Sequence, residues 1–264
     1  MKKNHRIIPV VWLIIVYAFL YLPIAILAFY SFTNASMIGQ PSTFSLKNYR
    51  TLFATPELRD MIIGTIVLAL VVGVLSTILG TFGAIGAFYS KRKNRTIIEA
   101  MNQVPVVNAD VVTGFSVCIL LVVVLGVDKD TYIPLVVGQM ALCTPFVYLQ
   151  VMPALSQMDH RIYEAALDLY CTPAQAVFKV LLRQLAPAIG SGFFTAVTLS
   201  MDDYFVTTYT KPAVFNTIST YTVNATKGAQ TQIKTALWAL SAIIFFIAIA
   251  VVIAANVRGK EKNA

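Results

Sequence analysis

The chain has 264 residues, of which 58% are hydrophobic and only 12% are charged. A soluble protein carries about a quarter charged residues, so this composition excludes a water-soluble globule and indicates a membrane protein. The net charge of +8 does not indicate a nucleic-acid partner, because the basic residues cluster at the ends of apolar segments. The three cysteines, Cys118, Cys143 and Cys171, form no CxxC pair, which excludes a disulfide scaffold and gives no metal or redox signal.

Six apolar stretches are long enough to cross a hydrocarbon core of about 30 Å, which takes about 20 helical residues. They cover residues 8–32, 61–89, 104–126, 132–152, 188–209 and 235–257. The first is longer than a secretory signal and lacks a small-residue cleavage site, so we expect it to remain as a span. We therefore predict an all-α polytopic membrane protein in which residues 1–264 form one transmembrane domain.

The basic residues predict the orientation of these spans. Thirteen of the 20 Lys and Arg residues fall in the two termini and in the second and fourth connections, and seven fall in the other connections. Cytoplasmic segments carry the excess of Lys and Arg. We therefore expect both termini to be cytoplasmic.

The connections differ in length and character. Residues 128–130 predict a tight turn, so the third and fourth spans should form an antiparallel hairpin. The outer connections, residues 33–60 and 210–234, are polar enough to suggest short amphipathic helices. Residues 153–187, called the elbow below, are long and helical, with Pro173 as a first-turn proline.

Glycines recur along the second predicted span, at Gly64, Gly73, Gly80, Gly83 and Gly86. A cofactor loop is the alternative, but small residues in a continuous apolar helix favour close helix packing. The sequence also lacks a GxxxxGK[ST] phosphate loop, an HExxH zinc motif and a nucleophile elbow. We expect no catalytic residue, metal site or cofactor in this chain.

Three acids lie within predicted spans. Asp202 and Asp203 follow the start of the fifth span by roughly 20 Å of helix rise, and Asp110 lies in the third. A carboxylate in hydrocarbon is unfavourable, so these acids predict an aqueous cavity or a helix break. Ser200 and Asp203 have capping-box spacing, and Asp110 suits a helix N-terminus, so structural roles remain open beside a transport role.

A cationic passenger is the interpretation that uses all three acids, because no Lys or Arg lies within the spans to neutralise them. Tyr204 and Tyr221 lie near the acid pair in sequence, and aromatic faces attract ammonium groups, although tyrosine also belongs to interfacial belts. The candidate substrate path is therefore Asp110, Asp202, Asp203, Tyr204 and Tyr221.

The elbow carries a second candidate site. Glu164, Ala165 and Ala166 open its first helix, where small alanines beside a charge suit a knob that seats in a partner's groove. A surface helix without a partner would have a similar sequence, so both interpretations stay open.

Two segments resemble a known family. Glu164, Ala165, Ala166 and Leu169, followed by Phe178, Val180, Leu182 and Pro187, resemble the EAA loop of bacterial ABC-importer permeases. The run of residues 198–204, Thr-Leu-Ser-Met-Asp-Asp-Tyr, is similar to the PotC-type permeases of spermidine/putrescine importers. Further similarity lies at Asp110, Val111, Val112, Ser116, Pro212, Ile218 and Tyr221. This chain departs from the family at Tyr170, where glycine is usual, and at Arg183 and Ala109, where proline is usual.

The resemblance implies a type I ABC importer permease of MetI-like architecture, in a bacterial cytoplasmic membrane. It implies polyamine import with a second homologous permease, an extracytoplasmic polyamine-binding protein and an ATPase dimer that binds ATP and Mg²⁺. Coupling to that ATPase would involve Glu164, Ala165, Ala166, Leu169 and Tyr170. The alternatives are an ABC permease for another cationic solute and an ion-coupled secondary transporter.

Overall fold

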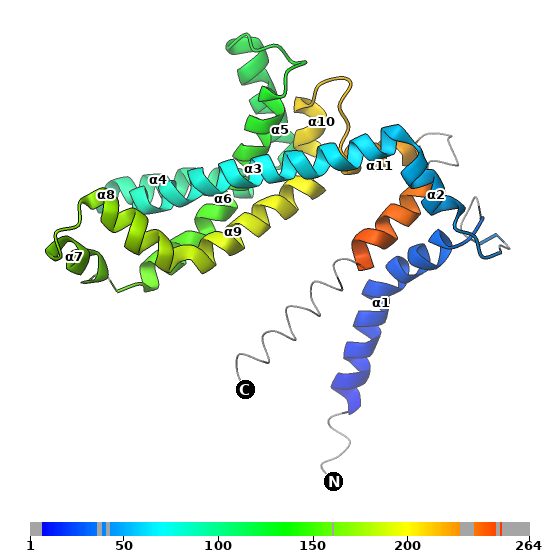
Figure 1. The fold of residues 1–264 in the computed structure, drawn as a ribbon, viewed down its shortest axis with the longest axis horizontal. Coiled ribbons are helices and arrows are strands. Elements are labelled where there is room, and N and C mark those ends of the chain that lie inside the picture. Colours follow the sequence, from blue (N-terminus) through cyan, green and yellow to red (C-terminus); the bar gives the residue numbers. More distant parts are fainter. Residues whose placement is uncertain are drawn as a thin grey trace. The chain divides into compact units, whose positions relative to one another are not determined.

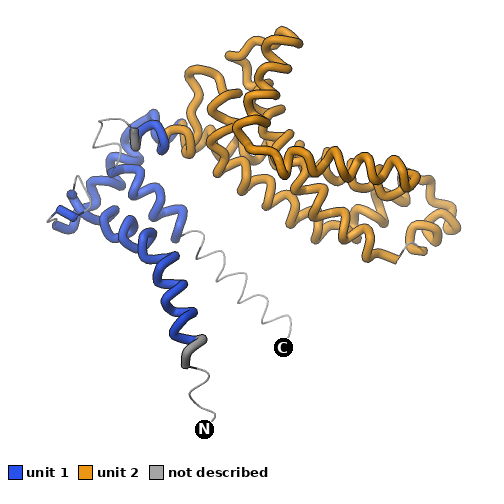
Figure 2. The backbone as a smooth tube through the Cα atoms, turned by 180° about the vertical axis from the view of Figure 1, so that it is seen from behind, with its two compact units in different colours: residues 1–60, 222–264 blue, residues 61–221 orange. Residues whose placement is uncertain are grey.

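The computed structural model describes residues 7–35, 39–40, 43–159, 161–227, 235–246 and 249, and most of these residues are helical. One isolated β-bridge joins Thr33 to Phe44. Two compact units are present, residues 1–60 with 222–264 and residues 61–221, coloured separately in Figure 2. The elements in chain order are α1 (Ile7–Ser31), α2 (Lys47–Ala54), α3 (Pro56–Phe88), α4 (Arg92–Val107), α5 (Asp110–Cys118), a π-helix (Ile119–Val124), α6 (Ile133–Gln157), α7 (Arg161–Asp168), α8 (Pro173–Gln175), a second π-helix (Ala176–Leu181), α9 (Leu182–Asp202), α10 (Phe205–Thr210) and α11 (Ile218–Lys227).

Long apolar helices confirm the polytopic architecture. Four described helices are long and apolar enough to cross a membrane, namely Val10–Ser31, Pro56–Phe88, Ile133–Gln157 and Pro173–Asp202. The pair α4 and α5 with its π-helix counts as a fifth if it forms one bent span. Thr235–Phe246 is a shorter apolar helix, and the rest of the predicted sixth span, residues 247–257, lies outside the described residues apart from residue 249.

The smaller unit joins α1 to α2 through buried polar contacts. The Asn48 Nδ2 atom donates hydrogen bonds to the carbonyl oxygens of Ser31 (3.1 Å) and Thr33 (3.0 Å). These bonds satisfy carbonyl groups at the end of α1, which have no partner inside the helix. The polar connection at residues 33–60 therefore contains the short amphipathic helix that its composition predicted.

The larger unit is built around α6. This helix packs along α9 and also contacts α4, α5 and α10 (Figure 1). Leu135, Val147, Val151 and Leu155 on α6 are fully buried and form the centre of the apolar core. Because α6 contacts several other helices, its side chains can link parts of the chain that lie far apart in sequence.

Glycines on α3 allow its close approach to this core, as their spacing predicted. A Cβ atom at Gly80 would lie 2.8 Å from the Val147 Cβ and 3.0 Å from the Thr144 carbonyl oxygen. A Cβ atom at Gly73 would lie 2.6 Å from a methyl carbon of Val197 on α9. Both distances are shorter than normal contact, so only glycine permits this packing of α3 on α6 and α9.

The third predicted span is broken, whereas the sequence predicted one continuous helix over residues 104–126. Asn108 and Ala109 are extended, with ψ values of 148° and 135°, and the helices on either side are bent by 106°. Pro105 has no N–H to bond within the last turn of α4, which weakens the helix there. The Asn108 Nδ2 atom then donates to Thr113 Oγ1 (3.2 Å), which stabilises the bend.

The elbow begins its second helix at Pro173, as predicted. Thr172 and Gln175 form a capping box: the Thr172 Oγ1 atom accepts from the Gln175 N–H (3.3 Å), and the Gln175 Oε1 atom accepts from the Thr172 N–H (3.1 Å). The helix then continues from Pro173 to Asp202. The part of the elbow that begins at Pro173 is therefore continuous with the predicted fifth span.

We expect Gly80→Ala to lower the stability of the detergent-solubilised protein by about 1–3 kcal/mol, because the added methyl group overpacks the contact between α3 and α6. Gly86→Ala is the matched control, since a Cβ atom at Gly86 would meet no atom within 4 Å. Thermal unfolding of both variants measures the effect. Equal melting temperatures would contradict this account of the packing.

Candidate functional site

The candidate site forms where α9 ends and α10 begins. Asp203 leaves the helical conformation (φ −64°, ψ 123°), and α10 starts two residues later at Phe205. The Asp203 carboxylate then accepts three hydrogen bonds from α10, from the Val206 N–H to Oδ1 (3.1 Å), and from the Thr207 N–H (2.7 Å) and hydroxyl (2.6 Å) to Oδ2. Asp203 thus starts the second helix.

The capping-box interpretation of Ser200 and Asp203 was therefore half right. A new helix does begin beside the acids after a break. Ser200, however, lies within the last turns of α9 and bonds to Gln139 of α6, so it caps nothing. The carboxylate of Asp203 satisfies the first N–H groups of α10 by itself.

Close packing holds α10 between α5 and α6. A Cβ atom at Gly114 of α5 would lie 2.7 Å from the Val206 Cα, and one at Gly138 of α6 would lie 3.0 Å from a Val206 methyl carbon. Glycine at both positions lets a six-residue helix sit against two neighbours. The position of the break is therefore set by backbone contact as well as by hydrogen bonds.

A cavity of about 270 Å³ opens at this break. Its lining combines carboxylates with aromatic and aliphatic side chains: Asp110, Leu142, Phe146, Leu199, Asp202, Asp203, Tyr204 and Phe205. The structure thus brings together four of the five predicted path residues. Tyr221 is half-buried on α11 and does not line the cavity.

The three acids differ in what their carboxylates contact. Asp203 is only 7% exposed, and both of its oxygens accept hydrogen bonds. Asp110 and Asp202 are exposed, and neither side chain has a hydrogen-bond or ion-pair partner among the described residues. Asp110 is the first residue of α5, after Ala109 at the N-cap position, where the helix dipole also favours its negative charge.

Lys211 is the nearest lysine along the chain after the acid pair, and its ammonium group already has hydrogen-bond partners. Its Nζ atom donates to the carbonyl oxygen of Phe215 (2.6 Å) and to Asn216 Oδ1 (2.9 Å). Partial burial lowers the pKa of Lys211, and the positive charge of Lys129 lowers it further. This ammonium group therefore binds its own loop and does not neutralise a cavity carboxylate.

Sequence reasoning missed two polar and aromatic contributors on α6. Phe146 lines the cavity and Gln139 accepts a hydrogen bond from Ser200 at the end of α9, but the hydropathy of residues 132–152 marks both simply as parts of a span. A side-chain amide in the middle of an apolar stretch is the feature of the sequence that could have indicated a polar contact between helices. Gln139 is such a residue.

The predicted coupling residues divide between the surface and the interior. Glu164, Ala165, Leu169 and Tyr170 are exposed, whereas Ala166 is buried, 6% exposed, on the side of α7 that faces the π-helix Ala176–Leu181. Four of the five are therefore accessible to a partner, and Ala166 packs the elbow together.

Tyr170 keeps the turn that a glycine usually makes. Its φ is +62°, the Cys171 N–H donates to the Ala166 carbonyl (3.1 Å), and the Tyr170 N–H donates to the Leu167 carbonyl (3.0 Å). These are the two bonds of a Schellman motif with Tyr170 at the left-handed C′ position. A side chain there is unfavourable by about 1–2 kcal/mol, and Tyr170 as a whole is 98% exposed.

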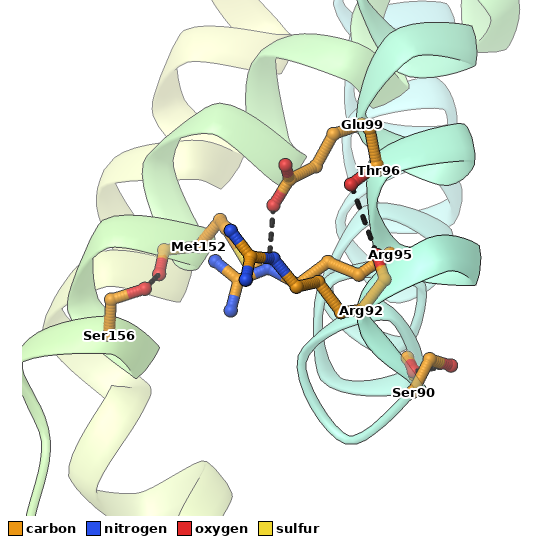
Figure 3. A network of polar contacts seen from close by, with 8 residues as sticks. Ser90, Arg92, Arg95, Thr96, Glu99, Met152 and Ser156 are labelled. Carbon is orange, nitrogen blue, oxygen red and sulfur yellow. Dashed lines mark hydrogen bonds and ion pairs between the residues drawn. The ribbon is translucent and has the colours of Figure 1, made fainter.

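Near the elbow, an ion pair lies within α4, and an aromatic contact joins α7 to the residue that follows α3. Figure 3 shows the Arg95 guanidinium bonded to Glu99 of the same helix (Nε to Oε1, 2.7 Å). The Tyr89 and Tyr163 rings lie 5.2 Å apart. The ion pair links residues i and i+4 of α4 and is partly exposed, so it contributes little to stability.

Comparison with known proteins identifies the family. A family model described as "Binding-protein-dependent transport system inner membrane component" matches residues 78–258. The chain belongs to this family. This permease is therefore a transport component and not an enzyme, it lies in the membrane as a multi-pass protein, and it works in a binding-protein-dependent system.

Curated relatives of this permease are also permeases. The permease is 25% identical over 252 residues to the spermidine/putrescine transport system permease protein PotC of Haemophilus influenzae, covering 96% of each chain. It is 28% identical over 205 residues to the putrescine transport system permease protein PotI of Escherichia coli K12, covering 76% of this chain and 73% of that one. The resemblance seen in the sequence is confirmed.

Two solved structures share the fold. A bacterial alginate ABC transporter, crystallised with an alginate pentasaccharide-bound periplasmic protein, matches with a TM-score of 0.70 at 16% identity over 96% of this chain and 92% of that one. An amino acid ABC transporter matches with a TM-score of 0.54 at 16% identity over 82% of this chain and 98% of that one. The all-α permease fold is thereby confirmed.

We expect Asp203→Asn to destabilise the permease by about 1–3 kcal/mol, because an amide has one acceptor oxygen and turns N–H groups toward the donors of α10. Asp202→Asn should leave stability unchanged, since its carboxylate has no partner to lose. Thermal unfolding of the two variants in the same detergent makes the comparison. A larger loss for Asp202→Asn would refute the assignment of the helix cap.

Proposed function

We propose that this permease is the membrane-spanning subunit of an ATP-driven importer of polyamines such as spermidine and putrescine, and that the cavity at the α9–α10 break lies on the translocation path. The observation that carries the proposal is the cavity itself. Three carboxylates surround it, and two of them, Asp110 and Asp202, have no partner among the described residues. The substrates of the PotC and PotI relatives point to the same chemistry.

Charge compensation favours a cation as the transported solute. Uncompensated carboxylates inside a membrane protein are unfavourable, and an ammonium group between Asp110 and Asp202 would offset that. The aromatic faces of Phe146, Tyr204 and Phe205 would add cation–π attraction. A cavity of about 270 Å³ is large enough for an ammonium group together with water molecules.

Two carboxylates without hydrogen-bond or ion-pair partners suit a site that a cation passes through, rather than a site that binds a cation tightly. A site on a path must bind its cation only moderately, because a cation held too firmly does not leave. Asp203 is already saturated by α10, which leaves Asp110 and Asp202 as the attracting groups. We assign Tyr221 no direct contact at this cavity and keep it as a candidate elsewhere on the path.

The partners follow from the family and from the elbow. A binding protein outside the membrane would deliver the polyamine, and a second homologous permease would complete the path. The exposed part of the elbow, Glu164, Ala165, Leu169 and Tyr170, would dock on an ATPase dimer that holds ATP and Mg²⁺. Both termini would be cytoplasmic, as the distribution of Lys and Arg predicts.

The decisive experiment measures ATP-dependent uptake of radiolabelled spermidine and putrescine into proteoliposomes that contain the copurified complex, with and without the binding protein. We expect uptake to require both ATP and the binding protein. Asp202→Asn should lower uptake at subsaturating substrate about tenfold, since an interaction with a charged group is lost. Asp60→Asn is the control, because this exposed acid lies outside the cavity.

Each outcome of that experiment is informative. Uptake driven by an ion gradient without ATP would favour a secondary transporter. If an intact complex does not take up polyamine, polyamines are excluded as the substrate, and another cationic solute remains as the alternative. Equal uptake by Asp202→Asn and Asp60→Asn would refute the role of the cavity.

The exposed ring of Tyr170 provides a separate test of ATPase coupling. Glycine accepts the left-handed conformation, so Tyr170→Gly removes the ring and keeps the turn. We expect substrate-stimulated ATP hydrolysis by the complex to fall about tenfold, as for loss of an aromatic interface anchor. Tyr170→Phe keeps the ring and should behave like the unmodified protein; a normal Tyr170→Gly variant would show that the ring does not contact the ATPase.

A further inference from the structure

Gln139 is a buried amide in the middle of α6, and both of its ends are bonded. The side chain is 0% exposed. Its Oε1 atom accepts a hydrogen bond from the Ser200 hydroxyl of α9, and its Nε2 atom donates to Thr207 Oγ1 of α10 (2.8 Å). One side chain of α6 therefore contacts the helices on both sides of the break.

The network also reaches the Asp203 carboxylate. Thr207 Oγ1 accepts from Gln139 and donates its own proton to Asp203 Oδ2 (2.6 Å). The Nε2 atom of Gln139 lies 3.5 Å from the Ser200 carbonyl oxygen, which belongs to the last turn of α9. The donors thus follow one direction, from Ser200 through Gln139 and Thr207 to Asp203, which strengthens each bond in the chain. We call these four residues the clasp.

Neighbouring threonines show that this arrangement is specific. A helical threonine commonly donates to the carbonyl four residues earlier. Thr208 and Thr210 of the same helix do so, toward the Tyr204 carbonyl (2.6 Å) and the Val206 carbonyl (2.7 Å). Thr207 donates to a side-chain carboxylate instead, and it is the one of the three that Gln139 contacts.

The clasp also explains why the two adjacent acids differ. Asp203 is held on α10 by three hydrogen bonds and its hydroxyl partner is held by Gln139. Asp202 and Tyr204 flank Asp203 directly, so fixing Asp203 fixes where both neighbours stand along the cavity wall.

We infer that Gln139 is a positioning residue: through Thr207 and Ser200 it holds Asp203 as the helix cap and thereby keeps Asp202 directed at the cavity. The inference rests on the proposed function where it concerns the passenger. Its structural part, the orientation of Asp202, is testable without any passenger.

The test compares Gln139→Leu with Gln150→Leu in the complete transporter complex. Gln150 is a matched control, because it lies on the same helix and also bonds to a serine of α9, Ser191 (3.1 Å), but is exposed and lies outside the cavity. We expect Gln139→Leu to raise the KM for ATP-dependent polyamine uptake roughly fivefold with little change in the maximal rate. Gln150→Leu should leave KM unchanged.

Two further comparisons separate positioning from a general loss of stability. In an Asp202→Asn background, Gln139→Leu should add no further increase in KM, since its effect passes through Asp202. Thr207→Val should reproduce the effect of Gln139→Leu, and Thr207→Ser, which keeps the hydroxyl, should restore a normal KM. Additive effects of Gln139→Leu and Asp202→Asn would overturn the inference.

A labelling experiment distinguishes failure of the clasp from failure of the proposed function. In a chain with Cys118, Cys143 and Cys171 replaced by serine, Asp202→Cys is labelled with a charged, membrane-impermeant thiol reagent. Gln139→Leu and Thr207→Val should each change the labelling rate severalfold, and Gln150→Leu should not. Identical rates in all variants would overturn the inference even if polyamine uptake is established, and changed rates would support it even if the passenger is another cation.

Discussion

The most important constraint on this permease is that a helix interrupted inside a membrane protein must still satisfy its backbone polar groups. Water is scarce there, and an unpaired N–H or carbonyl group is unfavourable by several kcal/mol. Asp203 meets this constraint for α10 with a single carboxylate. The break, the cavity beside it and the exposure of Asp202 all depend on that cap.

Close approach between the backbones of α5, α6 and α10 places α10 where the Asp203 carboxylate can cap it. Gly114 and Gly138 admit α10 between α5 and α6, and Gly73 and Gly80 let α3 lie against the same core. Small residues replace the hydrophobic effect as the organising feature, because lipid is as apolar as the side chains it would exclude. Gln139 uses the resulting proximity, since its amide can reach α9 and α10 only if α6 touches both.

The elbow differs from the break between α9 and α10, because its unfavourable backbone conformation at Tyr170 is retained. At the break, the N–H groups at the start of α10 would lack partners, and the Asp203 carboxylate accepts hydrogen bonds from them. At Tyr170, a left-handed backbone conformation is kept although the residue carries a side chain. The Schellman bonds of Tyr170 and Cys171 maintain the turn, and the ring is left fully in the open. This combination of an unfavourable conformation and an exposed ring is the reason that we propose Tyr170 as a contact with the ATPase.

The sequence by itself determined the class of protein, most of its helices and the chemistry of the site. Apolar length predicts α1, α3 and α6 because span length is a local property, and Pro173 marks a helix start for the same reason. The segments around Glu164 and Asp202 indicated the permease family. Only the tertiary structure decided that Asp203 is hydrogen-bonded and that Asp202 has no described partner, since the capping-box spacing of Ser200 and Asp203 left a structural role and a transport role open. The partners that distinguish them come from helix packing: Gln139 lies 61 residues from Ser200 and 68 residues from Thr207 along the chain. The bend at Asn108, the burial of Ala166 and the place of Phe146 in the cavity likewise depend on contacts between helices, which periodicity and hydropathy do not encode.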